Sequence, residues 1–520
     1  MAKKREERTR TSARPAGQAG RGCDLDGGYV SPVRSCKDLS LATVADTLKN
    51  SRYVQVLLTL TLIGILLRFS NLGFNSLWLD EASTYTFATL SIPGIWGATT
   101  GGEFNPPLFY WTEHVMLIFG NSEVVLRFIP ALLGVLTIPL VYCIGREFCD
   151  RNVGIIAAAG IAFSPFLIFY SQEARAYSMM LFFIAAAMVF FLKALKSDDL
   201  KEWALFGILS ALAFWSHFYA AVLIGALVLY ALYERLPKIR ADISSLRSMA
   251  AGIAVLAVLS LPLLMIILPL FARRTAGGPT FGYQGIMLIA ETFRQVLTSP
   301  LSLPGSDLIF LVLLVLFVVG VIQAFLIDRN KGVFLVSLTV LTFVISFILS
   351  YRIPMMPRYL IFLSIILWIG VALAYKPVFS LIANPGVVYG FILLLFVMSI
   401  PFLAVNYTTY TKEDWRGVSG DIVKWTNDGD YVAVLPGYIL QPLNYYYSNT
   451  TDRTILVGLS TAEELDDLSL QKGNATAYYI VTGDIMSADP SGGSFEWLKS
   501  HTQPIAQSSN MVIFTSPGTA

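Results

Sequence analysis

Charged residues are scarce in this sequence. Asp, Glu, Lys and Arg make up 14% of the 520 residues, whereas a soluble globular chain carries about 25%. Hydrophobic residues make up 55% and gather in long runs. This composition excludes a disordered chain, a coiled coil and an ordinary cytosolic enzyme, and it predicts a polytopic membrane protein.

Cysteine and histidine are also rare, with four and three copies. No cysteine follows Cys149, so the C-terminal region is expected to fold without disulfides. The sequence contains no Cys-x-x-Cys motif and no basic face with interleaved aromatics. These absences argue against a zinc-binding fold and against nucleic-acid binding.

Eleven apolar segments approach the roughly 20 residues that a membrane-spanning helix needs. They are 53–69, 125–145, 153–170, 178–194, 203–218, 220–234, 249–270, 307–326, 333–350, 359–375 and 385–403. The shorter segment 107–119 carries Glu113 and His114 and is predicted to lie at the membrane interface. The expected fold class is a polytopic α-helical membrane protein with a small extracytoplasmic C-terminal α/β domain.

Basic residues predict the orientation of these spans. Residues 1–52 are basic and polar, and we expect them to form a disordered cytoplasmic tail. Each predicted cytoplasmic loop carries Lys or Arg, as the positive-inside rule requires. The protein is therefore expected in the plasma membrane, with the N-terminus inside and the region after the last span outside.

The remaining chain divides into two predicted domains. Residues 53–405 form the transmembrane domain, with a first external loop at 70–124, and residues 406–520 form the external α/β domain. In the latter, short apolar runs at 431–435, 454–459, 477–481 and 511–515 alternate with helical patterns at 413–426, 461–470 and 493–500. A packing or acceptor-docking role is favoured for this domain.

The first external loop carries the most informative acids. Asp80 and Glu81 are adjacent, about ten residues after the first span. Acids in a first helical turn are also favoured by the helix dipole, which is the structural alternative. Glu103 follows two glycines and precedes Asn105-Pro106-Pro107, so the prolines are expected to hold it at a defined depth.

Further polar clusters lie on the same predicted side of the membrane. They contain Gln172, Glu173, Arg175 and Tyr177 after the third span, His217 and Tyr219 after the fifth, and Arg352 and Arg358 before the tenth. External arginines oppose the positive-inside rule, and anion binding explains them, although snorkelling toward lipid headgroups is an alternative. The gathering of acids, arginines and aromatics suits a lipid substrate with an anionic headgroup.

Several segments, in order along the chain, resemble the GT-C membrane glycosyltransferases. They are LDEA, GGEFNPPLFYW, RFIPALLGVLTIPLVYCIGREF, YSQEARAYSMM, MMPRYLIF and KEDWRGVSGDIVKW. The nearest branch is the prokaryotic one related to protein O-mannosyltransferases and lipid A aminoarabinose transferases. The resemblance covers about residues 53–425 and implies a polyprenyl-phosphate-linked sugar donor with an acceptor hydroxyl on a protein, lipid or glycan.

The resemblance also implies roles for individual residues. Asp80 matches the candidate general base, Glu81 is its companion, and Glu103 matches an acid that shapes the site and in some members contacts a metal. The donor phosphate and sugar are expected at Glu173, Arg175, Tyr177, Arg352 and Arg358, and the acceptor beside Asn105, His217 and Tyr219.

The sequence indicates no cofactor except a candidate divalent metal at Glu103. The predicted external loop 271–306 contains no histidine, which argues against a metal site like that of some aminoarabinose transferases.

A multi-span transporter or flippase for a lipid-linked or anionic substrate is the alternative function. It is expected to place ionisable residues or broken helices near the middle of the membrane. Most spans here lack charge at that depth, although Pro262 and Pro269 could break the seventh. A sensor that binds its ligand through the C-terminal domain is a third class.

Overall fold

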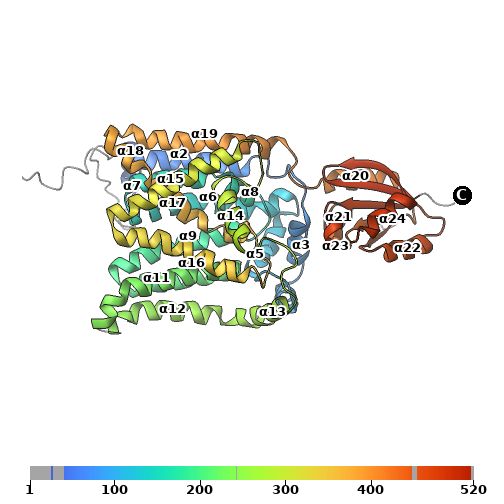
Figure 1. The fold of residues 1–520 in the computed structure, drawn as a ribbon, viewed down its shortest axis with the longest axis horizontal. Helices are drawn as coiled ribbons and strands as arrows, with labels where there is room; N and C mark the ends of the chain where they lie inside the picture. Colours follow the sequence, from blue (N-terminus) through green and yellow to red (C-terminus); the bar gives the residue numbers. More distant parts are fainter. Residues whose placement is uncertain (1–24, 27–39, 242, 448–453, 517–520) are drawn as a thin grey trace, which may run out of the picture.

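The computed structural model describes residues 25–26, 40–241, 243–447 and 454–516. A bundle of long helices spans residues 52–408, and a smaller α/β part follows it to residue 516 (Figure 1). We call these parts the membrane bundle and the C-terminal module. The module lies beside α3 (Leu79–Ala88), and we call this end of the bundle the module end.

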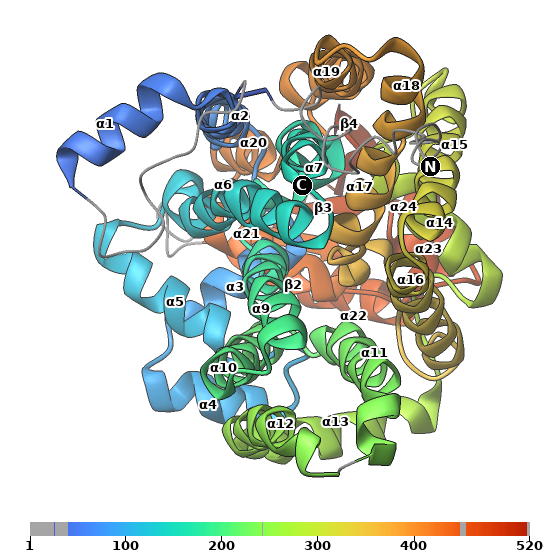
Figure 2. The ribbon, with the colours of Figure 1, turned by 90° about the vertical axis from the view of Figure 1, so that its left-hand side faces the viewer.

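Nine helices of the described residues are long and apolar enough to cross a membrane. They are Arg52–Phe69 (α2), Glu123–Phe148 (α6), Tyr177–Ser197 (α9), Ala220–Pro237 within α11 (Ala220–Ala241), Arg247–Gly277 (α12, Arg247–Ser260, and α13, Leu264–Gly277), Ser306–Ile327 (α15), Arg329–Leu349 (α16), Leu363–Ile382 (α17, Leu363–Leu373, and α18, Tyr375–Ile382) and Gly386–Thr408 (α19). The chain is therefore a multi-pass membrane protein, and Figure 2 shows the bundle end-on.

Two more segments bear on the predicted count of eleven spans. The helices α7 (Arg151–Phe163) and α8 (Pro165–Ser171) are bent by 55° against each other and make a tenth candidate if they count as one. The predicted span 203–218 corresponds to α10 (Leu200–Ser216), which has 17 residues. Such a helix is about 26 Å long, slightly less than the thickness of the hydrocarbon core. The fold class is confirmed, and the number eleven stays a prediction.

Shorter helices lie outside the spans. They are α1 (Leu41–Asn50), α4 (Ile92–Gly101), α5 (Leu108–Met116), α14 (Gly285–Leu297) and the 3-10 helix η6 (Pro357–Leu360). The predicted disorder of residues 1–52 is wrong for α1, because Ser40 and Thr43 form a capping box that starts a helix there. Residues 1–24 and 27–39 of that tail lie outside the described residues.

Glycines let some spans approach each other closely. A side chain on Gly320 of α15 would clash with the carbonyl oxygen of Gly370 in α17. Between α10 and α12, a side chain on Gly207 would clash with the carbonyl oxygen of Gly252. Small residues at such crossings bring helix backbones into contact, which is how membrane helices gain packing energy.

The C-terminal module contains one five-stranded sheet. The strands are Tyr431–Leu435 (β1), Ile455–Gly458 (β2), Ala477–Thr482 (β3), Gln503–Ser508 (β4) and Met511–Ser516 (β5), in the order β2-β1-β3-β5-β4. The first three strands are parallel, and β5 runs antiparallel to its two neighbours. Four of the strands were predicted. The edge strand β4 was not, because its sequence QPIAQS is polar and mostly exposed.

Helices cover both faces of this sheet. They are α20 (Trp415–Trp425), α21 (Leu440–Tyr447), α22 (Ala462–Gln471), α23 (Ile485–Ala488) and α24 (Gly493–His501). Core residues of α20 and α21 pack on one face and those of α22 and α24 on the other.

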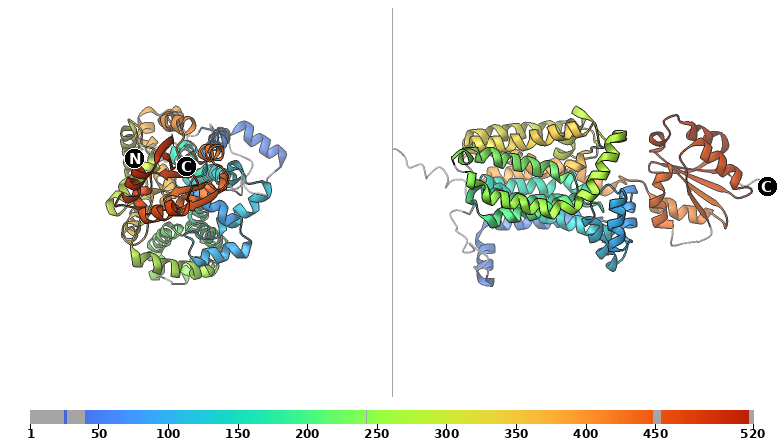
Figure 3. Two further views of the ribbon diagram at one scale, coloured as in Figure 1. Left: turned by 90° about the vertical axis from the view of Figure 1, so that its right-hand side faces the viewer. Right: turned by 90° about the horizontal axis from the view of Figure 1, so that it is seen from below.

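The module is attached through α21 as well as through the chain. Tyr446 accepts a hydrogen bond from the backbone of Leu77 at 2.7 Å and donates one to Glu123 at 2.7 Å. The hydroxyl of Ser83 in α3 donates to Gln441. Arg416 of α20 pairs with Glu123 at 2.5 Å. Figure 3 shows the module held against this end of the bundle.

Candidate functional site

The first turn of α3 presents its two acids to different surroundings. Asp80 is partly open, with 26% of its side chain exposed, whereas Glu81 is fully buried. Successive residues of a helix are turned by about 100° from each other, so neighbouring side chains face different partners. The adjacent acids of the sequence therefore do not form a catalytic pair in space.

Asp80 faces two arginines that come from separate parts of the chain. Its Oδ2 lies 3.9 Å from a guanidinium nitrogen of Arg175, between α8 and α9, and 3.7 Å from one of Arg358, in η6. Arg175 also donates to the carbonyl oxygen of Asp80 at 3.1 Å. Burial alone would lower the pKa of both arginines, but Asp80 and nearby tyrosines raise it, so both groups stay charged.

Aromatic rings enclose this arginine–aspartate cluster. Tyr359 stacks on Tyr219 with ring centres 4.9 Å apart, and His217 lies 5.5 Å from Tyr359 and 5.7 Å from Tyr177. The guanidinium of Arg358 lies 5.4 Å from the centre of the Trp78 ring. Such faces offer flat surfaces against which a sugar ring can pack, and they position the arginines through cation–π contacts.

Glu103 belongs to a second polar group at the same end of the bundle. Its Oε1 accepts hydrogen bonds from Tyr110 at 2.7 Å and from Asn105 at 3.1 Å. Burial and the neighbouring Glu103 carboxylate raise the pKa of Tyr110, which therefore stays a donor. Tyr110 and Glu103 are close enough to Arg175 to contribute to raising its pKa, so this polar group borders the arginine–aspartate cluster.

The donor set around Glu103 does not fit a resident metal ion. Its neighbours Tyr110 and Asn105 donate protons to the carboxylate, and nowhere in the described chain do three His, Cys, Asp or Glu side chains come together as metal ligands. A divalent metal needs several such oxygen or nitrogen ligands.

A buried quartet of charges lies behind Asp80. It consists of Glu81, Arg127 of α6, Glu173 and Lys412, which belongs to the link between α19 and α20. Glu81 accepts two hydrogen bonds from the Arg127 guanidinium, both at 2.7 Å, and a third from the backbone of Ala174 at 2.8 Å. Lys412 lies 3.2 Å from Glu81 and 3.1 Å from Glu173.

The two acids of the quartet are not equivalent. Burial by itself raises the pKa of Glu81, but the charges of Arg127 and Lys412 outweigh it and lower the pKa to about 2. Burial together with the charge of Glu81 raises the pKa of Glu173, and Lys412 opposes this only in part. Glu81 is therefore a firmly ionised anchor with its oxygens occupied, not a group open to an acceptor.

The structure brings most of the predicted residues together. Asp80, Arg175, Tyr177, His217, Tyr219 and Arg358 meet around one cluster, and Glu103 with Asn105 borders it. Glu81 and Glu173 lie in the quartet instead. Arg352 has an exposed side chain after α16, away from these contacts. The roles assigned to these residues remain predictions.

Three residues of the quartet and the arginine–aspartate cluster were not predicted from the sequence. Arg127 lies in a segment that was predicted only as an apolar span, although a charged residue at the end of a span points to a functional or structural partner. Lys412 begins the similar segment KEDW, and Trp78 directly precedes LDEA.

Glu113 of α5 was expected to face the interface, and this is wrong. Its side chain is fully buried, and neither carboxyl oxygen has a hydrogen-bond partner among the described residues. Burial raises the pKa of Glu113 well above its ordinary value, because the charged form would be unsolvated.

Substitution of Glu113 is therefore expected to be tolerated. Glu113→Gln keeps the shape of a protonated carboxyl, and Glu113→Met removes a buried group without partners, so neither should lower the thermal unfolding midpoint in detergent. Tyr110→Phe, on the same helix, removes a made hydrogen bond and provides the contrast. A fall of the Glu113→Gln midpoint below that of Tyr110→Phe would show that the Glu113 carboxylate is charged and paired.

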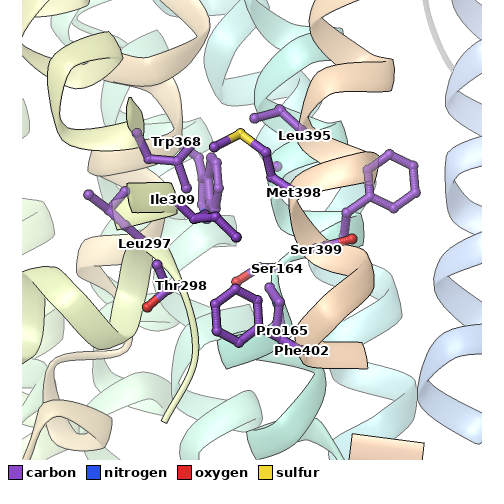
Figure 4. A pocket seen from close by; sticks show the side chains of 13 residues that line it. Ser164, Pro165, Leu297, Thr298, Ile309, Trp368, Leu395, Met398, Ser399 and Phe402 are labelled. Atoms are coloured by element: carbon purple, nitrogen blue, oxygen red, sulfur yellow. The ribbon is translucent and has the colours of Figure 1, made fainter. Parts of the chain in front are cut away.

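A small pocket lies elsewhere in the bundle, at the break between α7 and α8 (Figure 4). Ser164 and Pro165 at the break line it together with Trp368, Met398 and Phe402. Its lining is mostly apolar and contains none of the acids or arginines described above. It is therefore distinct from the arginine–aspartate cluster.

Comparisons with known proteins agree with this architecture. Residues 105–266 match the family model described as dolichyl-phosphate-mannose-protein mannosyltransferase. An uncharacterized protein of Aquifex aeolicus (strain VF5) is 30% identical over 144 residues, which cover 25% of this chain and 28% of that protein. The match thus spans less than a third of either protein.

Solved structures share the fold over most of the chain. ArnT from Cupriavidus metallidurans bound to undecaprenyl phosphate covers 88% of this chain and 97% of its own, with a TM-score of 0.60 and 14% identity. The oligosaccharyltransferase AglB from Archaeoglobus fulgidus, in complex with an inhibitory peptide and a dolichol-phosphate, covers 89% and 74%, with a TM-score of 0.54 and 14% identity. The predicted resemblance to GT-C membrane glycosyltransferases is thereby confirmed at the level of the fold.

Proposed function

We propose that this chain, a membrane protein with the GT-C fold, transfers a sugar from a polyprenyl-phosphate carrier to an acceptor hydroxyl at the module end of the bundle. The observation that carries the proposal is the position of Asp80 within 4 Å of both Arg175 and Arg358. One carboxylate between two guanidinium groups provides a base beside an anion-binding site. The family match over residues 105–266, and the lipid phosphates bound by the two similar structures, support the substrate class.

The reaction is a single displacement. Arg175 and Arg358 bind the lipid phosphate, and the sugar packs against the partly exposed rings of Tyr219 and Tyr359. Asp80 takes the proton of the acceptor hydroxyl as its oxygen attacks the anomeric carbon, and the bond from that carbon to the phosphate oxygen breaks. The phosphate leaves with its charge matched by the arginines, and the anomeric centre inverts.

The orientation follows from the same proposal. The module end faces the outside of the cell, where polyprenyl-linked sugars meet their acceptors, and the basic ends of the loops at the other end face the cytoplasm. In this arrangement Glu103, held by Tyr110 and Asn105, borders the acceptor side.

Transfer in isolated membranes tests the proposal. Membranes that contain the chain are incubated with radiolabelled polyprenyl-phosphate sugars and cell-envelope acceptors, and new glycosides are separated from the lipid donor. We expect label in a glycoside. Movement of label across the membrane without a new glycoside would instead identify a flippase and overturn the proposal.

Arg358→Gln is expected to lower transfer by about 10²- to 10³-fold, the usual loss when a charge-stabilising donor is removed. Arg358→Lys keeps the charge but lacks the planar guanidinium group, which can donate two parallel hydrogen bonds to a phosphate. Its rate should therefore lie between those of Arg358→Gln and the wild type. The matched control is Arg329→Gln, an exposed arginine at the opposite end of α16. Equal loss in the control would show that Arg358 has no special role.

A further inference from the structure

Lys412 connects two segments of the chain that build the arginine–aspartate cluster. We call them the two motifs: the first contains Asp80 and Glu81, and the second contains Glu173 and Arg175. The Lys412 ammonium is 3.2 Å from Glu81, beside Asp80, and 3.1 Å from Glu173, two residues before Arg175. Only 8% of its side chain is exposed. The lysine does not belong to the bundle proper, since it lies after α19 on the link that leads into the C-terminal module.

Each of the two motifs divides its side chains in the same way. In the first, Asp80 faces the site and Glu81 faces the quartet, and in the second, Arg175 faces the site and Glu173 faces the quartet. The backbone of Ala174 donates to Glu81 at 2.8 Å, which ties the motifs directly to each other. The separation between Asp80 and Arg175 is thus determined by how the two buried acids are held.

Trp78 gives Lys412 a second route to the site. The ammonium lies 5.5 Å from the centre of the Trp78 ring, and the Arg358 guanidinium lies 5.4 Å from the same centre. The ring is therefore in contact with both a quartet cation and a site cation. A shift of Lys412 moves the surface against which Arg358 rests.

We propose that Lys412 is a positioning residue for transfer, through which the link to the C-terminal module holds Asp80, Arg175 and Arg358 in their working geometry. The inference rests on the proposed function for the reaction that is positioned. It adds that the module is needed at the site itself, not only as a docking surface for acceptors.

Charge balance gives the physical reason. Glu81 and Glu173 are matched by Arg127 and Lys412, so the buried quartet has no net charge. Without Lys412, two buried carboxylates share one arginine, and their repulsion drives the two motifs apart unless Glu173 takes up a proton. The other groups that face Glu173 are Arg358 of η6 and Tyr170 of α8. Neither lies within salt-bridge distance of Glu173 in the part of the chain described here.

The test uses the full chain in membranes and follows transfer from the polyprenyl-phosphate sugar. Lys412→Met should lower kcat by about 100-fold with little change in KM for the acceptor, because misplacement of reacting groups by about 1 Å has effects of this size. Lys412→Arg keeps the charge and should retain activity within about tenfold of the wild type. Lys424→Met removes a lysine of the same module that is 72% exposed, and its activity should be unchanged.

A second substitution separates charge balance from simple loss of packing. In Lys412→Met with Glu173→Gln, the quartet is again neutral, so we expect at least about tenfold recovery of kcat over Lys412→Met alone. The single variant should also lose activity as pH rises and Glu173 ionises, and the double variant should lack this dependence. A lysine that acted only through packing would show neither effect.

The outcomes distinguish the two proposals. Full kcat in Lys412→Met, or no recovery in the double variant, overturns the positioning role while the wild-type reaction stands. A wild-type chain that transfers no sugar overturns the proposed function. In that case the thermal unfolding midpoints of the same variants in detergent decide whether charge balance in the quartet holds the two motifs together. A midpoint that is highest in the wild type, lower in the double variant and lowest in Lys412→Met supports this, and equal midpoints contradict it.

Discussion

Asp80→Asn should reduce sugar transfer by about 10²- to 10⁴-fold, the contribution that a positioned general base usually makes. The amide has nearly the same shape as the carboxylate, but it cannot accept the proton of the acceptor hydroxyl. Donor binding should be preserved or stronger, because Arg175 and Arg358 lose a competing anion. The measurement is kcat with a radiolabelled polyprenyl-phosphate sugar, together with binding of undecaprenyl phosphate.

Asp307→Asn is the matched control. Asp307 is the second residue of α15, as Asp80 is of α3, and it is exposed. Both substitutions remove the same interaction with a helix dipole, which is worth less than about 1 kcal/mol at an exposed position. If Asp80→Asn turned over at a rate near that of the control, another group would have to be the base.

Glu81→Gln should destabilise the protein without changing any group in contact with substrate. It leaves Arg127 buried without its carboxylate partner, and breaking a buried ion pair in this way costs about 3–5 kcal/mol of unfolding free energy. The hydrogen bond from Ala174 is weakened as well. Unfolding is followed by titration with a denaturing detergent in micelles.

Replacement of both partners should be less harmful than the sum of the single losses. Glu81→Leu with Arg127→Met removes one charge of each sign and leaves Lys412 paired with Glu173. The surface pair of Glu496 and Lys499 provides the control, since its side chains are 72% and 52% exposed and their removal should change little. Additive losses in the double variant would mean that Glu81 and Arg127 act independently.

Long apolar runs allowed the membrane bundle to be predicted from the sequence. Their lengths follow from the thickness of a bilayer, which leaves few alternatives. Elements with weaker sequence patterns were not predicted. The edge strand β4 is too polar to be recognised, and α21 was not predicted although it packs on α3. Capping by Ser40 and Thr43, a local hydrogen-bond effect, outweighed the polar composition around α1.

The candidate site was predicted in part. The side of the membrane on which each motif ends follows from span order, so Asp80, Arg175 and Arg358 could be expected to meet. Which of two adjacent acids is buried depends on the rotation of α3, and that rotation is set by Arg127 and Lys412, which are 46 and 331 residues away from Glu81. Partners at such separations leave no local pattern.

The contacts of Tyr446 and Arg416 with Glu123, and of Tyr446 with Leu77, have a consequence for protein engineering. They make the C-terminal module and the first loop, residues 70–124, a matched set of surfaces, with Lys412 packed between them. A chimera that exchanges only the module between relatives would leave half-buried tyrosine and carboxylate groups facing foreign neighbours. A functional exchange would therefore have to transplant the loop, the link and the module as one cassette.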